Sequence, residues 1–508
     1  IRRRGDRVSV GLSLVIAWAM TISASGWRAS GQDLWYRITI RDSPCGYLHE
    51  TEVRRDGLIH SRSTERLRVD RGGAVVELSQ ATIFEEDIRG TPLTATVRVE
   101  TGGRPVLQVY DFPDGQPRER AVEVGSTSLK PDPSDDSWLT PSEVRRFLKA
   151  RIGAGADRIT YLTVDPYARM KPLRIEMTRL GIERRDVLGR ALDLSRWRVR
   201  SDGSSIVFEE LRSADGVLVS SIADVGLGLM KIELVDQATA LEALGSPPPE
   251  LLDSTLLPVM NMVGRTDEAV TAGYRVHFET ERPWVLPNAG AQHVRPLRSG
   301  SLEVTIDAAS GSPASDEERV DPGLLAASAY IDTDDPLVRR FFLELERVPD
   351  DTTLEACDRL RVAVARHISN KTFGVAFGSA SDAVRSRSGD CTEHAVLLAA
   401  GFRLAGLPAR VATGLVHAPA SGFPHGAFAW HMWTQVLIDG TWWDFDATRR
   451  NRFDAGHLLV STSSLDGGTG EQALSEMLLL LGRMHVEAIC VDGVVLDSDD
   501  TTRRGGVR

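Results

Sequence analysis

The sequence predicts an α+β protein in which antiparallel β-rich domains precede a C-terminal domain with a central helix packed on an antiparallel sheet. Three observations support this prediction. Short apolar runs separated by Gly-containing turns fill the first half of the chain without a strong helical period. An apolar run with the length of a helix follows at 391–404. A strand–turn–strand pattern comes next, at 430–447.

The N-terminus has the pattern of a secretory signal. Four arginines within residues 1–7 precede an apolar run at 8–20, and two Ala-Ser-Gly tripeptides follow within 24–31. A basic segment, an apolar segment and small residues are the three parts of a signal peptide. We therefore expect residues 1–31 to direct the protein to a secreted, periplasmic or cell-envelope location. A buried helix and an uncleaved anchor are the alternatives.

Composition and turn signals divide the rest of the chain. A Ser-, Pro- and Asp-rich linker at 125–142 precedes a short helix that Pro141 is expected to open. The predicted boundaries are a β-rich domain at 32–130, a second β-rich domain at 150–245, a bridging β segment at 250–318, a C-terminal domain at 325–495 and a polar, frayed tail at 496–508.

Charge narrows the classes of partner. The chain has 508 residues and a net charge of −11, which argues against a nucleic-acid-binding surface because such a surface must neutralise phosphates. No apolar run after the N-terminus approaches the length of a membrane span. We expect a protein or peptide substrate and no nucleic-acid partner. Association with the cell envelope and the oligomeric state stay open.

The four cysteines fit neither a metal site nor a dense disulfide framework by their spacing. One bridge in an exported protein, for instance between Cys357 and Cys490, stays open. No His/Asp/Glu cluster has metal-ligand spacing along the sequence, and no phosphate-binding loop occurs. We therefore expect no metal and no cofactor.

Cys391 stands at the predicted start of a buried helix. Asp390 is a suitable N-cap, and Glu393 three residues later completes a pair like a capping box. The helix is apolar nearly all round to Leu404, where a Gly and a Pro soon stop it. A helix N-terminus presents unpaired N–H groups and positive dipole, which favour a thiolate. The position is typical of a nucleophile.

The hairpin at 430–447 supplies a base and its partner. With a two-residue Asp-Gly turn at 439–440, His431 and Asp446 share a face as diagonal neighbours, about 7–8 Å apart between backbone positions. Asp444 lies one pair farther from the histidine. The register therefore favours Asp446 as the group that orients His431.

These residues resemble the transglutaminase-like superfamily, whose members are papain-like thiol enzymes. The resemblance covers about residues 325–465. Its four blocks, in order, are Gly389-Asp390-Cys391, Leu398 to Arg410, His431-Met432-Trp433, and Trp442 to Thr448. Ala447 replaces the proline usual in the family, and Met432 the usual alanine.

The resemblance implies a papain-like α+β core with a catalytic triad of Cys391, His431 and Asp446. A cysteine, a histidine and a carboxylate in these roles perform acyl transfer through a thioester. We expect a protease or amidase, with protein-glutamine cross-linking as an alternative. A non-catalytic cell-envelope binding protein is a third reading.

Three further side chains are candidates for the substrate site. Strand alternation points Trp433 and Trp442 toward the face of the triad, where they either wall the acyl site or pack in the core. His394 follows the cysteine by three residues, and a packed helix histidine is the favoured alternative. We expect the segment 418–429 to be a loop. The second oxyanion donor is expected from the loop at 371–378.

Overall fold

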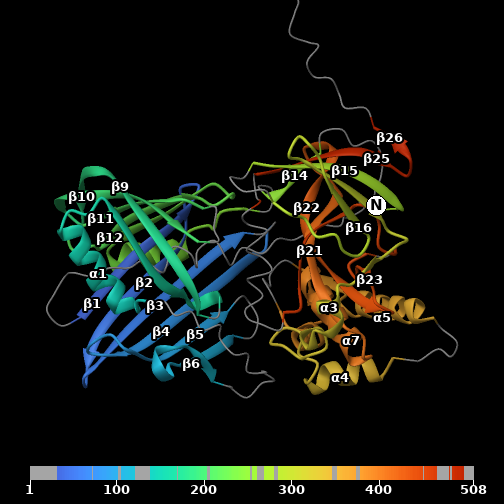
Figure 1. Cartoon of the computed structure of the whole chain (residues 1–508), viewed down its shortest axis with the longest axis horizontal. Coiled ribbons are helices and arrows are strands. Elements are labelled where there is room, and N and C mark those ends of the chain that lie inside the picture. Colours follow the sequence, from blue (N-terminus) through green and yellow to red (C-terminus); the bar gives the residue numbers. More distant parts are fainter. Residues whose placement is uncertain are drawn as a thin grey trace, which may run out of the picture.

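The structure is a computed structural model. It describes residues 31–70, 73–100, 105–120, 138–168, 170–202, 206–251, 255–259, 268–279, 284–345, 352–372, 378–449, 451–465, 480 and 483–496. A large sheet (blue to green in Figure 1) lies beside a C-terminal part that contains three smaller sheets and a group of helices (yellow to red). The predicted signal segment 1–31, apart from Gly31, and the tail after residue 496 lie outside the described residues.

The large sheet is antiparallel throughout and has the order β7-β6-β5-β4-β3-β2-β1-β13-β12-β11-β10-β9-β8. Its strands are β1 (Gly31–Ile40), β2 (Ser43–Arg55), β3 (Leu58–Asp70), β4 (Val75–Asp87), β5 (Pro92–Glu100), β6 (Val106–Asp111), β7 (Arg118–Arg120), β8 (Arg158–Asp165), β9 (Lys171–Val187), β10 (Arg190–Ser201), β11 (Phe208–Arg212), β12 (Leu218–Asp224) and β13 (Leu229–Val235). The two β-rich regions expected from the sequence thus share one sheet, because β1 pairs with β13.

Helix α1 (Pro141–Gly153) packs against this sheet and begins at the expected proline. The Thr140 hydroxyl caps it by accepting a hydrogen bond from the Glu143 N–H, and the Glu143 carboxylate accepts one from the Thr140 N–H. The hydroxyl of Thr140 also donates to Glu86 of β4 at 2.6 Å, which ties the start of the helix to the sheet.

The C-terminal part contains the other sheets. One has the order β18-β23-β22-β21-β24, with β14 paired to β22; a second has the order β16-β17-β15-β25-β26; β19 and β20 form a short parallel pair. The strands are β14 (Leu257–Pro258), β15 (Thr271–Phe278), β16 (Gln292–Pro296), β17 (Leu302–Asp307), β18 (Ser312–Pro313), β19 (Asn370–Lys371), β20 (Ser388–Gly389), β21 (Ala409–Ala420), β22 (Phe423–Ile438), β23 (Thr441–Phe445), β24 (His457–Ser463), β25 (Met484–Val491) and β26 (Val494–Val495).

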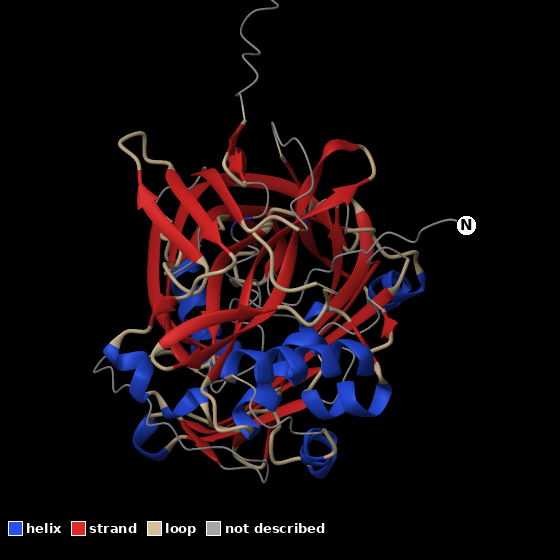
Figure 2. Ribbon diagram, turned by 90° about the vertical axis from the view of Figure 1, so that its right-hand side faces the viewer, coloured by secondary structure: helices blue, strands red, loops and turns tan. Residues whose placement is uncertain are grey.

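The helices beyond α1 are α2 (Gln237–Gly245), α3 (Asp316–Val320), α4 (Pro336–Leu343), α5 (Thr353–His367), α6 (Ala380–Ser386) and α7 (Cys391–Leu404). Figure 2 shows most of the helices gathered at the lower side of the strands. Helix α7 packs on β21 and β22, and α4, α5 and α6 pack on α7. Residues 391–403 of α7 are all buried, as its apolar sequence predicts. Within the described ranges, no helix combines the length and the apolarity needed to cross a membrane.

Two expectations differ from the structure, and one open question is answered. The expected loop at 418–429 is largely strand, because β21 and β22 continue to a tight turn at 421–422. The four cysteines, all of them described, form no disulfide, so Cys357 and Cys490 are not bridged. Strand β23 ends at Phe445 rather than Ala447, which leaves Asp446 in the turn that follows. The sequence also predicts a helix at 472–482, and this segment falls almost wholly outside the described residues.

Candidate active site

Cys391 is the first residue of α7 and is buried. Asp390 is the N-cap, and its carboxylate accepts a hydrogen bond of 2.8 Å from the Thr392 N–H. The Glu393 carboxyl completes the expected capping box by accepting from the Asp390 N–H at 2.7 Å. Gly389 is required here, since a Cβ at this position would lie 2.5 Å from the Cβ of Glu393. The sequence Gly-Asp-Cys thus sets the cysteine at the start of a tightly packed helix.

Glu393 is the one acidic residue in the first turn of α7 and is fully enclosed. Its carboxyl accepts N–H bonds from Gly378 and Asp390, both at 2.7 Å. Burial and the charge of Asp390 nevertheless raise the pKa of Glu393 to about 8. Glu393 is therefore protonated at neutral pH.

This assignment predicts how stability depends on pH. An unfolded glutamate loses its proton near pH ~4.3, whereas folded Glu393 keeps it to about pH 8. Its contribution is therefore fully present below pH ~4.3 and is lost as pH rises through about 8. Glu393→Gln should flatten the fall in melting temperature between pH 5 and 9, measured by thermal unfolding. Glu355→Gln, in the exposed capping box of α5, is the control and should leave that fall unchanged. Parallel curves for Glu393→Gln and wild type would contradict the assignment.

The hairpin of β22 and β23 has the register expected from the sequence. Ile438 pairs with Thr441 and Gln435 with Asp444 around the Asp439-Gly440 turn. The ladder ends at Phe445, so Asp446 does not reach His431 as a strand neighbour. It is held instead by a turn in which the N–H and hydroxyl of Thr448 donate to its Oδ1 at 2.8 and 2.7 Å.

His431 and Asp446 form a buried hydrogen-bonded pair. The Nε2–H of His431 donates to Asp446 Oδ2 at 2.9 Å, because only a protonated nitrogen satisfies a carboxylate oxygen. The other ring nitrogen, Nδ1, is buried and has no hydrogen-bond partner among the described residues. Nδ1 is therefore the basic atom of the ring. Asp444, the alternative partner, is occupied by the Trp433 indole at 2.7 Å and the Gln435 amide at 2.8 Å.

Two contacts fix the direction of α7 over β22. Near the start of the helix, the Thr434 hydroxyl donates to the Ala395 carbonyl at 3.0 Å. Near its end, the Arg403 guanidinium donates to the carbonyl of Ala409, which pairs with Val436 of β22. Helix and strand therefore run in the same sense, and the start of α7 points toward the part of β22 that precedes Thr434.

A second link ties the approach to Cys391 to the aspartate turn. Strand β20, which ends two residues before the cysteine, pairs with β19. From β19, Lys371 Nζ donates to the Thr448 carbonyl at 2.9 Å, and Thr448 itself binds Asp446. The thiol, His431 and Asp446 thus come from three segments that converge at the start of α7.

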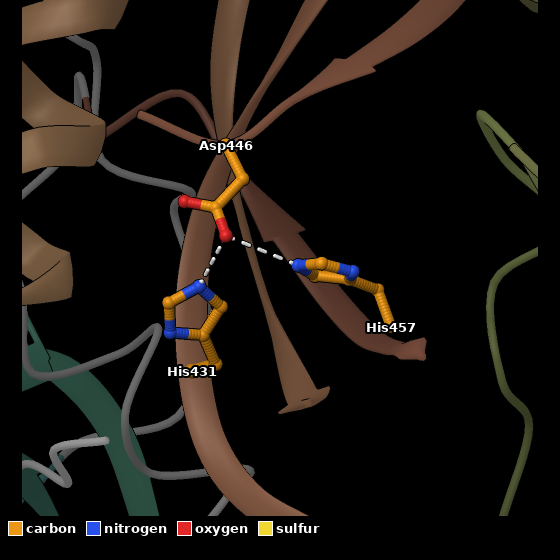
Figure 3. A group of neighbouring side chains, drawn as sticks. All are labelled: His431, Asp446 and His457. Carbon is orange, nitrogen blue, oxygen red and sulfur yellow. Dashed lines mark hydrogen bonds and ion pairs between the residues drawn. The ribbon is translucent and has the colours of Figure 1, made fainter. Parts of the chain in front are cut away.

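The structure adds a residue that sequence reasoning missed. His457, the first residue of β24, directs its Nε2 to the same Asp446 Oδ2 at 3.1 Å. Figure 3 shows the rings of His431 and His457 approaching this one oxygen from different sides. Its Nδ1 lies 3.0 Å from the backbone carbonyl and 3.1 Å from the carboxylate of Asp454. Nothing in the sequence spacing indicates that this histidine reaches Asp446.

The site contains three possible metal-ligand atoms within 4.8 Å of one another: a ring nitrogen of His431, a ring nitrogen of His457 and a carboxylate oxygen of Asp446. This spacing is close enough to hold a metal ion. Sequence spacing does not predict this cluster, because its members lie on three segments. The two histidines bind the carboxylate at ordinary hydrogen-bond distances, so the polar atoms of the group satisfy one another directly. We therefore treat the group as a proton-sharing network.

Burial and charge set the protonation of this network. Burial lowers the pKa of His431; Asp446 opposes that shift, and His457 and Arg449 add to it. Burial would lower the pKa of His457 as well, but Asp454 and Asp446 raise it to about 9. Burial would raise the pKa of Asp446, yet the two histidines hold it well below its usual range. At neutral pH, His431 is neutral, His457 is a cation and Asp446 is ionised.

The other predicted site residues lie at different places. The Trp433 ring lies 6.2 Å from the His431 ring, between centroids, and is buried. Trp442 packs beneath the Arg410 guanidinium, 3.9 Å from the ring centroid, and donates to Glu318 at 3.2 Å. These described contacts of Trp442 include no residue of the proposed triad.

His394 lies one helical step from Cys391 and is buried. Its Nδ1 donates to the Asp390 carbonyl at 2.5 Å, and its Nε2 has no hydrogen-bond partner among the described residues. Burial lowers the pKa of His394 to about 4, so the ring is neutral and Nε2 is an acceptor. Of the loop expected to supply the second oxyanion donor, residues 373–377 lie outside the described residues, and the Gly378 N–H is already bonded to Glu393.

Comparison with known protein families gives a match to part of the chain. Residues 344–447 match the sequence profile of the transglutaminase-like superfamily. A search of curated proteins found no match.

Three solved structures are similar to parts of the chain. A β-barrel-like protein with a domain of unknown function from Brucella abortus is 12% identical, covers 41% of this chain and 98% of its own, and has a TM-score of 0.34. A candidate cysteine protease from Cytophaga hutchinsonii is 18% identical and has a TM-score of 0.27; the match covers 46% of this chain and 88% of the protease. The periplasmic domain of TgpA from Pseudomonas aeruginosa is 17% identical and has a TM-score of 0.18; the match covers 37% of this chain and 74% of that domain.

The matched segment contains α5, α6, Cys391 and the whole of α7, His431 and Asp446, and it ends within the turn that holds the aspartate. Residues 344–447 of this chain are thus similar to the core of the transglutaminase-like superfamily.

Proposed function

We propose that the C-terminal part of the chain is a cysteine-dependent acyl hydrolase that cleaves amide or peptide bonds. The observation that carries the proposal is the state of His431. Its Nε2 is held by Asp446 at 2.9 Å while its Nδ1 is buried without a described partner. A histidine oriented by a carboxylate, with one nitrogen left to act as a base, and a cysteine at the start of the helix packed on the same strand are the groups that nucleophilic catalysis requires.

The proposed reaction has two halves. In the first, Cys391 Sγ attacks the carbonyl carbon and His431 Nδ1 takes the thiol proton; the C–N bond then breaks, and His431 returns the proton to the leaving amine. In the second, water attacks the thioester carbon while His431 takes a proton from the water. The C–S bond then breaks, His431 returns the proton to the sulfur, and the carboxylic acid leaves. Asp446 holds the Nε2–H of His431 through both halves. The backbone N–H of Cys391 is the natural first donor to the oxyanion.

Hydrolysis and transfer differ only in what attacks the thioester. The direct test incubates the full chain with a fluorogenic peptide library and with a glutamine-containing protein plus a fluorescent primary amine. Peptide cleavage, or conversion of glutamine to glutamate, that Cys391→Ala removes would support hydrolysis. Covalent incorporation of the amine would instead support protein-glutamine cross-linking. Absence of both from a protein with a reactive Cys391 would exclude these substrate classes.

A reactive thiol is the prediction that needs no substrate. Alkylation of Cys391 by iodoacetamide, located by mass spectrometry, should be fast at pH 7 because His431 accepts the thiol proton. His431→Ala should slow it at least about tenfold at pH 7 and move its midpoint toward pH ~8.5, the value of an ordinary thiol. Half-buried Cys490 is the internal reference and should not respond to the variant. Equal rates for Cys391 in both proteins would overturn the proposed pair.

The expected cellular location is part of the same proposal. An exported enzyme that acts on proteins or peptides of the cell envelope accords with the signal pattern in residues 1–31. Fractionation of cells that produce the full chain, with N-terminal sequencing of the product, tests it. A cytoplasmic product that retains these residues would contradict export.

A further inference from the structure

His457 is surrounded by acceptors at both ring nitrogens. Its Nδ1 faces the carbonyl and the carboxylate of Asp454, at 3.0 and 3.1 Å, and its Nε2 faces Asp446 Oδ2 at 3.1 Å. An oxygen of this kind can only accept a hydrogen bond. Both nitrogens must therefore carry protons, and geometry alone makes the ring an imidazolium.

The groups around this ring keep the positive charge in place. Asp446 and Asp454 contact it directly, and the charge of Asp444 also acts on it. The cations are Arg449, with Nε at 3.8 and 3.9 Å from Asp446 and Asp454, and His431 when protonated.

Two aromatic rings complete the enclosure of His457. Phe453 stacks on its ring at 4.3 Å, and Trp433 meets it edge-on at 5.2 Å. Both are distances between ring centroids. The ring is fully buried, so water does not compete for its protons.

His457 and His431 share one carboxylate oxygen, and their ring centroids are 5.7 Å apart. Asp446 can orient both rings, but its single negative charge is already matched by the cation at His457. A second proton on His431 would add a positive charge beside an existing one. A unit charge at 5.7 Å lowers the affinity for that proton by about two pKa units at an effective dielectric constant near 20.

We propose that His457 is a positively charged positioning residue, which clamps Asp446 against His431 and keeps His431 neutral so that it acts as a base. The proposal rests on the proposed thiol chemistry, in which His431 takes the thiol proton. In this arrangement the resting site holds a thiol and a neutral imidazole.

Histidine NMR on the full chain tests this without any substrate. The protein is labelled with ¹⁵N and ¹³C at histidine in the Cys391→Ala background, and His431 and His457 are assigned with single variants. We expect His457 to keep both ring protons up to about pH 9 and His431 to be neutral at pH 7. His457→Gln, which can still donate to Asp446 but has no charge, should raise the pKa of His431 by about one to two units.

Asp454→Asn is the matched variant, because it keeps the His457 ring and removes the carboxylate that helps to charge it. It should lower the pKa of His457 and raise that of His431. In the protein with Cys391 intact, both variants should move the acid limb of the alkylation rate to higher pH. A purely structural role would reduce thermal stability in both variants without moving the titration of His431, and this would overturn the proposal.

The outcomes separate this inference from the proposed function. An unreactive Cys391 would overturn the thiol chemistry, whereas the titration of His431 in the Cys391→Ala background still decides the role of His457. Added Zn²⁺ that removes the ring protons of His457 at equimolar concentration would show that the cluster holds a cation instead. That result would overturn the proposal. Unchanged spectra with Zn²⁺, together with a shifted His431 in both variants, would support it.

Discussion

Replacing Cys391 by alanine should reduce turnover by about 10⁴-fold or more and leave the fold intact. The expected loss is large because the thioester cannot form, and members of a catalytic triad act as a unit rather than additively. The residue occupies the first position of α7, where the cap is made by Asp390 and Glu393 and not by the thiol. Activity is measured on whichever peptide or amide substrate the screen identifies, and melting temperature on the same samples.

Cys490→Ala provides the matched control for this loss. Cys490 lies on β25, outside the matched segment, and is half-buried. The Cys490→Ala variant should retain full activity although it lacks one thiol. Turnover by Cys391→Ala within tenfold of wild type would rule out a thioester mechanism, whatever the identity of the substrate.

Asp446→Asn should reduce both activity and stability. The side chain keeps its shape, but the amide cannot hold His431 in the required tautomer, and an equivalent change in a serine triad lowers turnover about 10⁴-fold. It also removes the carboxylate between His457 and Arg449. Removing one partner of a buried ion pair costs about 3–5 kcal/mol, since the remaining charge is left uncompensated. Turnover and chemical denaturation on the same variant measure the two effects.

Asp444→Asn separates these effects from burial alone. Asp444 lies two residues earlier, is also buried, and accepts bonds from Trp433, Gln435 and the Ala291 N–H. Its substitution should cost about 1–3 kcal/mol of stability, the range for one unsatisfied buried group. It should leave turnover within about tenfold, because it does not touch His431. Equal losses of activity in both variants would contradict the choice of Asp446 as the orienting group.

Local signals predicted much of the site. A Gly, an N-cap and a Glu three residues on specify the start of α7, and the Asp-Gly turn specifies the register of β22 and β23. Both are short-range rules, since caps and two-residue turns depend on neighbours in the chain. The register chose Asp446 even though the strand ends one residue before it.

Long-range pairing accounts for most of what the sequence could not predict. The antiparallel contact of β1 with β13 merges two expected β regions, and no local pattern encodes a partner about 190 residues away. The expected loop at 418–429 became strand because β21 and β22 pair across it. Pairing between strands depends on the whole sheet, which local propensity does not describe.

The positions proposed for the nucleophile, the base and its partner follow from local sequence signals, because capping, alternation and turn length act over a few residues. The electrostatics of the site depend on the tertiary structure. His457 and Arg449 reach Asp446 from a strand and a turn whose approach depends on packing. The protonation of His431 follows from those charges together with burial, and charge and burial in a folded interior are properties of three-dimensional neighbours, not of sequence spacing.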